Sequence, residues 1–99
     1  MMLHIINQSP FDSHTLDDCL GVAKPNCSLL FIENGVYALL GLTDSQQQFI
    51  ELYNIKLYFL KPDIEARGLQ KNILSNTLTI TDHEFVDLVI EHRSNQSWY

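Results

Sequence analysis

Basic residues are scarce in this sequence. Six Lys and Arg stand against 12 Asp and Glu in 99 residues, which gives a formal net charge of −6. Contacts to nucleic-acid phosphates need clustered Lys and Arg, whose attraction supplies most of the non-specific affinity. Only Lys24 lies in the first half of the chain, so at most a mildly basic local face can form in the second half. We therefore expect no direct contact with nucleic acid.

Long apolar runs and an export signal are also missing. No apolar run approaches the roughly 20 residues that a membrane-spanning helix requires. The start, MMLHIIN, lacks the charged head, long apolar centre and small-residue cleavage site of a signal peptide. With 45% hydrophobic and 18% charged residues, the composition is that of a globular protein. We expect a single cytoplasmic domain spanning residues 1–99, with no membrane contact.

Glycine-rich loops and metal-ligand patterns are absent too. The turn at residues 7–10 reads NQSP, whereas a dinucleotide site needs glycine there so that the backbone can approach the pyrophosphate. The Walker phosphate loop is equally missing. The two cysteines form no CxxC pair and the four histidines are scattered, which fits no metal site. The sequence predicts neither a cofactor nor a metal.

Cys19 is the strongest candidate nucleophile. A reactive cysteine needs a cation or a helix N-terminus to stabilise its thiolate. Cys19 instead follows Asp17 and Asp18 and lies on the apolar stripe of a predicted helix, and both nearby carboxylates and burial disfavour a thiolate. His14 lies five positions earlier, off the same helical face. We expect a structural role for Cys19 and, since it has no activating neighbour either, for Cys27.

Apolar spacing predicts alternating strands and helices. Apolar runs bounded by turn residues predict strands at residues 2–6, 28–33, 55–60 and 78–80. Helical spacing predicts helices around residues 16–23, 36–42, 49–53, 63–67 and 85–89. This alternation indicates an α/β fold: a mostly parallel sheet with helices on both faces, in the flavodoxin-like three-layer arrangement. Candidate N-caps are Asp12 or Ser13, Asp44 or Ser45, and Thr81 or Asp82.

The end of the chain is polar and then abruptly aromatic. Residues 94–97 read SNQS and are followed by Trp98 and Tyr99. A polar terminus is expected to fray, whereas large aromatic side chains are enriched at the centres of protein interfaces. Two interpretations stay open: Trp98 docks onto the sheet of its own chain, or it contacts a partner.

The carboxyl ends of the predicted strands are where a doubly wound fold binds its ligands. That rule points to residues 8–11, 33–36 and 60–63 and to the residues after Ile80. Asp63 and Arg67 lie four residues apart, a favourable ion-pair spacing on a helix. Ser9 is suited to hydrogen bonds within its turn, and His4, inside the first strand, is expected to be a hydrogen-bonded interior or interface histidine.

Several motifs follow one another along the chain. Leu3-His4 and Ser9-Pro10-Phe11 lie at the start, LLFIENGVYA occupies residues 29–38, LYFLKPDIEARG occupies residues 57–68, and Trp98 lies near the end. In this order and spacing they resemble the TusB/DsrH family nearly end to end, with a DsrEFH-like fold. The sequence departs from the family pattern in an additional leading Met and in Cys27.

The resemblance implies a non-catalytic subunit of a cytoplasmic sulfur-relay complex. In the TusB branch, TusB, TusC and TusD form a dimer of heterotrimers that passes persulfide sulfur through TusE toward 2-thiolation of the wobble uridine in certain tRNAs. In the DsrH branch, a similar complex serves sulfur oxidation. The sulfur-carrying cysteine is attributed chiefly to the TusD/DsrE subunit. DsrH-like members can carry a cysteine in the first helix, where Cys19 lies.

Three functions compete. The first is a non-catalytic assembly subunit that meets TusC-like and TusD-like partners in a complex contacting a TusE-like protein. The second is a sulfurtransferase carrying persulfide on Cys19, and the third is a small ligand-binding module. For the first function, the predicted partner-interface residues are Asn34, Gly35, Val36, Tyr37, Lys61, Asp63, Arg67 and Trp98.

Overall fold

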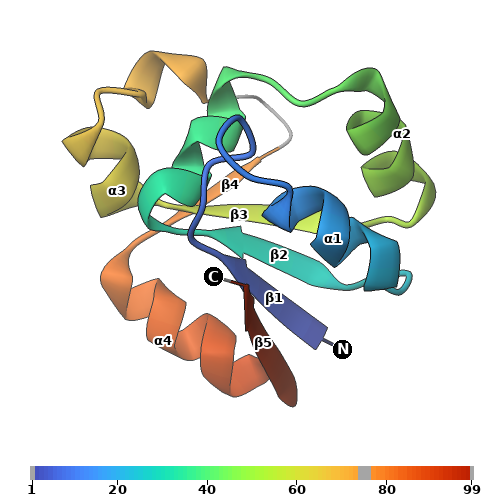
Figure 1. Cartoon of the computed structure of the whole chain (residues 1–99). Helices are drawn as coiled ribbons and strands as arrows, with labels where there is room; N and C mark the ends of the chain where they lie inside the picture. Colours follow the sequence, from blue (N-terminus) through green and yellow to red (C-terminus); the bar gives the residue numbers. More distant parts are fainter. Residues whose placement is uncertain (1, 74–76, 99) are drawn as a thin grey trace.

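Five parallel strands form one sheet in the order β4-β3-β2-β1-β5. The computed structural model, shown in Figure 1, describes residues 2–73 and 77–98. Strands and helices alternate along most of the chain, as the apolar spacing predicts. The elements are β1 (Met2–Ile6), α1 (Thr15–Val22), β2 (Ser28–Phe31), η1 (Glu33–Leu40), α2 (Asp44–Leu52), β3 (Lys56–Leu60), α3 (Lys61–Ala66), η2 (Gln70–Asn72), β4 (Leu78–Ile80), α4 (Asp82–Glu91) and β5 (Ser94–Trp98).

Helices cover the two faces of the sheet unequally. α1, η1, α2 and α3 lie on one face and α4 lies on the other (Figure 1). Side chains alternate along each strand, so Phe31 and Phe59 point toward the larger helical layer, where their rings stack 4.8 Å apart. Leu3 and Leu30 point the other way and pack with Leu88 of α4. β2 is buried on both faces, as its unbroken apolar sequence predicts.

The helix starts differ from two of the predicted caps. Thr43, not Asp44 or Ser45, caps α2: its side chain accepts a hydrogen bond from the Gln46 N–H, and the Thr43 N–H donates one to Gln46 Oε1. This reciprocal pair satisfies two N–H groups of the first turn, which sets the start of the helix one residue earlier. Thr81 caps α4 in the same way, as predicted.

The first helix begins without a side-chain cap. Its N-cap residue is His14, whose side chain makes no capping hydrogen bond, so the prediction of Asp12 or Ser13 is wrong. The reason lies in the preceding loop. The Asp12 and Ser13 N–H groups both donate to the Ser9 carbonyl, which makes residues 9–13 a turn that precedes the helix. Ser13 Oγ accepts from the Thr15 N–H at 3.4 Å, from one position outside the N-cap.

Two further segments differ from their predicted form. The helix expected at residues 36–42 is a 3-10 helix, η1, which begins earlier, at Glu33, directly after the end of β2. The polar tail is a strand: Ser94–Trp98 pairs in parallel with β1, and Trp98 lies opposite Ile6. Within residues 2–73 and 77–98, none of the helices has the length and apolar character needed to cross a membrane.

Candidate functional site

The loops at the carboxyl ends of β1 and β2 meet at Gly35. Gly35 is buried, and its N–H donates to the Ile32 carbonyl at 2.8 Å. The Ile32 N–H donates to the Ile6 carbonyl at 3.0 Å. A Cβ added at Gly35 would overlap that same Ile6 carbonyl oxygen. Glycine therefore lets η1 press against the end of β1.

A polar cluster joins η1 to α3. The Glu33 N–H donates to Asp63 Oδ2 at 2.6 Å, which fixes a backbone with a positive φ of 50°. Arg67 Nε donates to Asn34 Oδ1 at 3.1 Å, and the guanidinium lies 5.9 Å from the centre of the Tyr37 ring. The structure thus brings together four of the predicted interface residues from two separate motifs.

Asp63 and Arg67 contact one another as their spacing predicts. Arg67 Nη1 lies 3.9 Å from Asp63 Oδ1 and donates to the Asp63 carbonyl at 3.2 Å. Both side chains are about one fifth exposed, at 22% for Arg67 and 23% for Asp63. The Asp63 carboxylate thus accepts one backbone N–H and lies within ion-pair distance of the guanidinium. The cluster connects η1 to α3 at the carboxyl edge of the sheet.

The remaining predicted interface residues are distributed unevenly. Val36 is fully buried and Gly35 lies beneath the surface, so both support this edge from inside. Lys61 is exposed at the start of α3. Trp98 lies at the other side of the sheet, on β5, and does not join the cluster.

Trp98 docks onto its own sheet. Its Nε1–H donates to His4 Nδ1 at 3.0 Å, and the two ring centroids lie 6.0 Å apart. His4 is 3% exposed, and burial lowers its pKa. Because Nδ1 accepts this hydrogen bond, the imidazole is neutral there. Of the two interpretations of the aromatic tail, the structure shows the first.

Both cysteines are free and buried. Cys19 is 0% exposed, and burial, followed by the charge on Cys27, raises the pKa of its thiol to about 12. Burial also raises the pKa of Cys27. Since the thiolate is the nucleophile, burial disfavours the reactive form of both side chains.

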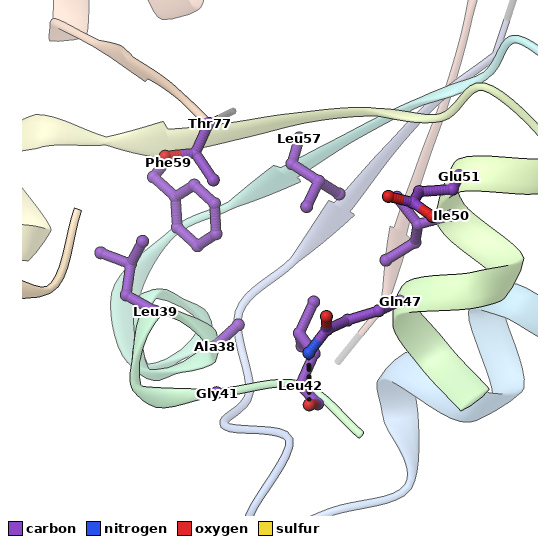
Figure 2. A pocket seen from close by; sticks show the side chains of 10 residues that line it. All are labelled: Ala38, Leu39, Gly41, Leu42, Gln47, Ile50, Glu51, Leu57, Phe59 and Thr77. Carbon is purple, nitrogen blue, oxygen red and sulfur yellow. Dashed lines mark hydrogen bonds between the residues drawn. The ribbon is translucent and has the colours of Figure 1, made fainter. Parts of the chain in front are cut away.

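An apolar pocket opens between η1 and α2, above β3 (Figure 2). It holds about 120 Å³, and Figure 2 shows apolar side chains such as Leu39 and Phe59 pointing into it. Gln47, at its rim, donates from Nε2 to the Leu42 carbonyl at 2.9 Å. Its lining residues include no histidine, cysteine or cation, and its polar side chains are Gln47, Glu51 and Thr77. Across residues 2–73 and 77–98, no group of three His, Cys, Asp or Glu is arranged for a metal ion.

One surface feature escaped the sequence-based predictions. Glu84, Asp87 and Glu91 line one flank of α4, all on the same side of the helix. The signal was present in their spacing, because positions i, i+3 and i+7 share a helical face. The apolar positions of this helix predict only its buried face, so they do not reveal the acidic flank.

Comparison with known proteins places this fold in a family. Residues 8–95 match the model of the family described as DsrH like protein. Protein TusB of Pectobacterium parmentieri is 34% identical over 97 residues, covering 98% of this chain and 100% of the relative. Protein TusB of Cronobacter sakazakii is 35% identical over 100 residues, with the same shares of each chain.

Two solved structures have a similar fold. The ychN protein from E. coli superposes with a TM-score of 0.77 at 19% identity, covering 98% of this chain and 97% of that one. Protein Tm0979 from Thermotoga maritima gives 0.64 at 25% identity, covering 93% and 94%. The first likeness concerns the fold alone, whereas the family match and the TusB relatives extend over nearly the whole sequence. The chain therefore belongs to the TusB/DsrH family.

Proposed function

We propose that this chain is a non-catalytic, TusB-type subunit of a cytoplasmic sulfur-relay complex that supports 2-thiolation of the tRNA wobble uridine. Its companions are TusC-like and TusD-like subunits in a dimer of heterotrimers, and the assembled complex contacts a TusE-like protein. Full-length similarity to proteins named TusB supports this branch of the family over the sulfur-oxidation branch.

The environment of Cys19 carries the non-catalytic assignment. A persulfide carrier must expose a thiolate to its donor. Cys19 is fully buried, and its thiol pKa is raised to about 12. The polar cluster of Asn34, Tyr37, Asp63 and Arg67 is held by internal hydrogen bonds and a cation–π contact, and it contains no thiol to carry sulfur. The chain therefore contributes an ordered binding surface to the complex and no sulfur-carrying group.

Deleting the gene and complementing the strain tests this function. Wobble-uridine thiolation, measured by mass spectrometry of digested tRNA, is expected to fall in the deletion strain. It should return equally with the wild-type chain and with the Cys19→Ala variant. Normal thiolation in the deletion strain would refute the proposed role, and failure of a folded Cys19→Ala variant to restore it would assign the sulfur-carrying step to Cys19.

Native mass spectrometry of the complex supplies the partner test. The tagged chain is co-expressed with the TusC-like and TusD-like subunits of the same cell, and the mass of the purified assembly is measured. We expect two copies of each subunit. An assembly of the other two subunits that forms with equal yield and mass when this chain is omitted would contradict the proposal.

A further inference from the structure

The face of the sheet that carries α4 is only half covered. α4 packs over Leu3 and Leu30, which are 0% exposed. On the same face, Lys56 is exposed, Tyr58 is partly exposed and Leu78 is 50% exposed. Parallel sheets are normally covered on both faces. Leu60 and Ile80, farther along β3 and β4 on this face, are each 7% exposed and pack with Leu88. Within residues 2–73 and 77–98, it is therefore the amino-terminal part of β3 and β4 that lacks this cover.

Two adjoining cavities lie between α4 and the exposed part of β3. They hold about 230 and 250 Å³. Because both include Tyr58 and Glu91, they form one groove, which we call the α4 groove. Its lining residues are Ser28, Lys56, Tyr58, Ile80, Glu84, Asp87, Leu88, Glu91, His92 and Arg93.

Internal hydrogen bonds define one end of the α4 groove. His92 Nδ1 lies 2.8 Å from the Leu88 carbonyl, and Nε2 lies 3.2 Å from Ser28 Oγ. A carbonyl accepts only, so in the neutral ring Nδ1 carries the proton and Nε2 accepts from the serine hydroxyl. These bonds tie the end of α4 to the start of β2, so the groove has a fixed wall.

Carboxylates dominate the helical side of the groove. Glu84 accepts the N-cap hydrogen bond of Thr81, but neither Asp87 nor Glu91 has a hydrogen-bond or ion-pair partner within residues 2–73 and 77–98. Lys56 and Arg93 line another part of the groove, but neither forms an ion pair with Asp87 or Glu91, and an exposed carboxylate row without an ion-pair partner favours a ligand that supplies a cation.

Apolar side chains lie next to this acidic row. Val86 and Ile90, one turn apart on α4, are 57% and 74% exposed, and Leu78 lies on the sheet at 50%. Interfaces between proteins combine apolar contact with a polar rim. The α4 groove and the outer side of α4 together have this composition.

Charge selects the occupant. A second copy of the chain has the same net charge of −6 and the same acidic row, so like charges would face each other. Nucleic-acid phosphates and anionic lipid headgroups are repelled for the same reason. We infer that the α4 groove and the outer side of α4 dock a segment of a partner protein that presents Lys or Arg beside apolar side chains. The inference rests on the proposed function only in taking that partner to be a companion subunit of the relay complex.

Charge reversal tests the surface. The Asp87→Lys/Glu91→Lys double variant is expected to fold, since a cation near a helix C-terminus is favourable. Binding to the co-purified TusC-like and TusD-like subunits should weaken about tenfold or more. Asp12→Lys/Glu51→Lys makes the same change in net charge at exposed sites away from the groove and should bind within about twofold of wild type. Equal binding by both double variants would overturn the inference while leaving the proposed function intact.

A second measurement works without those subunits. Amide shifts of the isotope-labelled chain are recorded while a 14-residue amphipathic helical peptide of Leu and Lys is added. We expect shifts at Tyr58, Leu78 and the acidic side of α4, and their loss in Asp87→Lys/Glu91→Lys. Shifts that map elsewhere, or a homodimer contact at this surface, would refute the assignment even where the wild-type chain joins no complex.

Discussion

At Gly35, the absence of a side chain decides how closely η1 approaches β1. The Ile6 carbonyl, which accepts from the Ile32 N–H, occupies the space that a Cβ at residue 35 would need. The sequence motif around this glycine resembles a family pattern, yet the reason for glycine is a backbone contact that no local spacing reveals. That contact fixes the start of η1, from which Asn34 and Tyr37 project.

Gly35→Ala should therefore destabilise the fold. Overpacking of this kind costs about 1–3 kcal/mol, because either the backbone of η1 or that of β1 must move. Urea unfolding measures the change. Gly21→Ala is the matched control, since Gly21 lies in α1 with nothing within 4 Å of its added Cβ. The control should be neutral or stabilising by up to about 1 kcal/mol, and equal effects at both sites would contradict the assigned contact.

Cys19 should resist alkylation in the folded chain. With a pKa of about 12, its thiolate is a very small fraction at pH 8. Iodoacetamide should react with it about a hundredfold or more slowly than in the urea-unfolded chain, where the thiol has an ordinary pKa. A Cys27→Ser background leaves Cys19 as the sole thiol. Equal alkylation rates in the folded and the unfolded chain would show that Cys19 is accessible and reactive, and it would again be a candidate sulfur carrier.

At the scale of elements, β5 shows what sequence patterning cannot detect. Four of its five residues are exposed and polar, so neither apolar alternation nor an apolar run marks it as a strand. Its ladder with β1 and the Trp98–His4 hydrogen bond hold it in place. Backbone pairing is independent of side-chain identity, which is why a tail with no strand signature completes the sheet.

The other elements were predictable where burial of a strand or helix face determines the apolar pattern of the sequence. β2 and β3 follow from their apolar runs, and parallel pairing brings the segments after them to the same edge. The hydrogen bonds from Glu33 to Asp63 and from Arg67 to Asn34 join residues 30 and 33 positions apart, and their side-chain geometry is not encoded in local spacing. The cap of α2 was missed because three neighbouring residues all carry suitable oxygens.

The attachment of β5 should depend on pH through His4. Burial lowers the pKa of His4 in the folded chain below its unfolded value of 6.5. The unfolded chain therefore binds more protons in that range, and this contribution to stability is complete above pH 6.5 and lost as pH falls through the folded pKa. Unfolding followed by circular dichroism at pH 7.5 and 5.5 should show a larger loss for the wild type than for His4→Gln. Identical losses would exclude His4 as the source.

At the scale of the whole molecule, charge and coverage of the sheet point the same way. A net charge of −6 repels polyanions, whereas the uncovered β3–β4 strip and the acidic side of α4 favour a cationic protein surface. A domain of about 100 residues buries only about two thirds of its unfolded surface. Burial of further surface against a companion protein would therefore add to the stability of this fold.

The isolated chain should not bind tRNA. In a filter-binding assay at about 150 mM salt, a physiological ionic strength, we expect no retention above that of a neutral carrier protein, because too few cations are clustered to neutralise phosphates. An Asp87→Lys/Glu91→Lys chain is a useful companion sample, since it places two new cations beside Arg93 and Lys56. Salt-sensitive retention of the wild-type chain would show that the charge argument fails.

The pairing of Trp98 with His4 has a practical consequence. The chain contains one tryptophan, Trp98. It is the last residue of the edge strand β5, and its indole donates a hydrogen bond to the His4 imidazole. Its fluorescence emission consequently reports on the edge of the sheet formed by β5. The emission should change when the terminal strand detaches, and no attached dye is needed. Companion proteins that themselves lack tryptophan would let assembly be followed in real time by light alone.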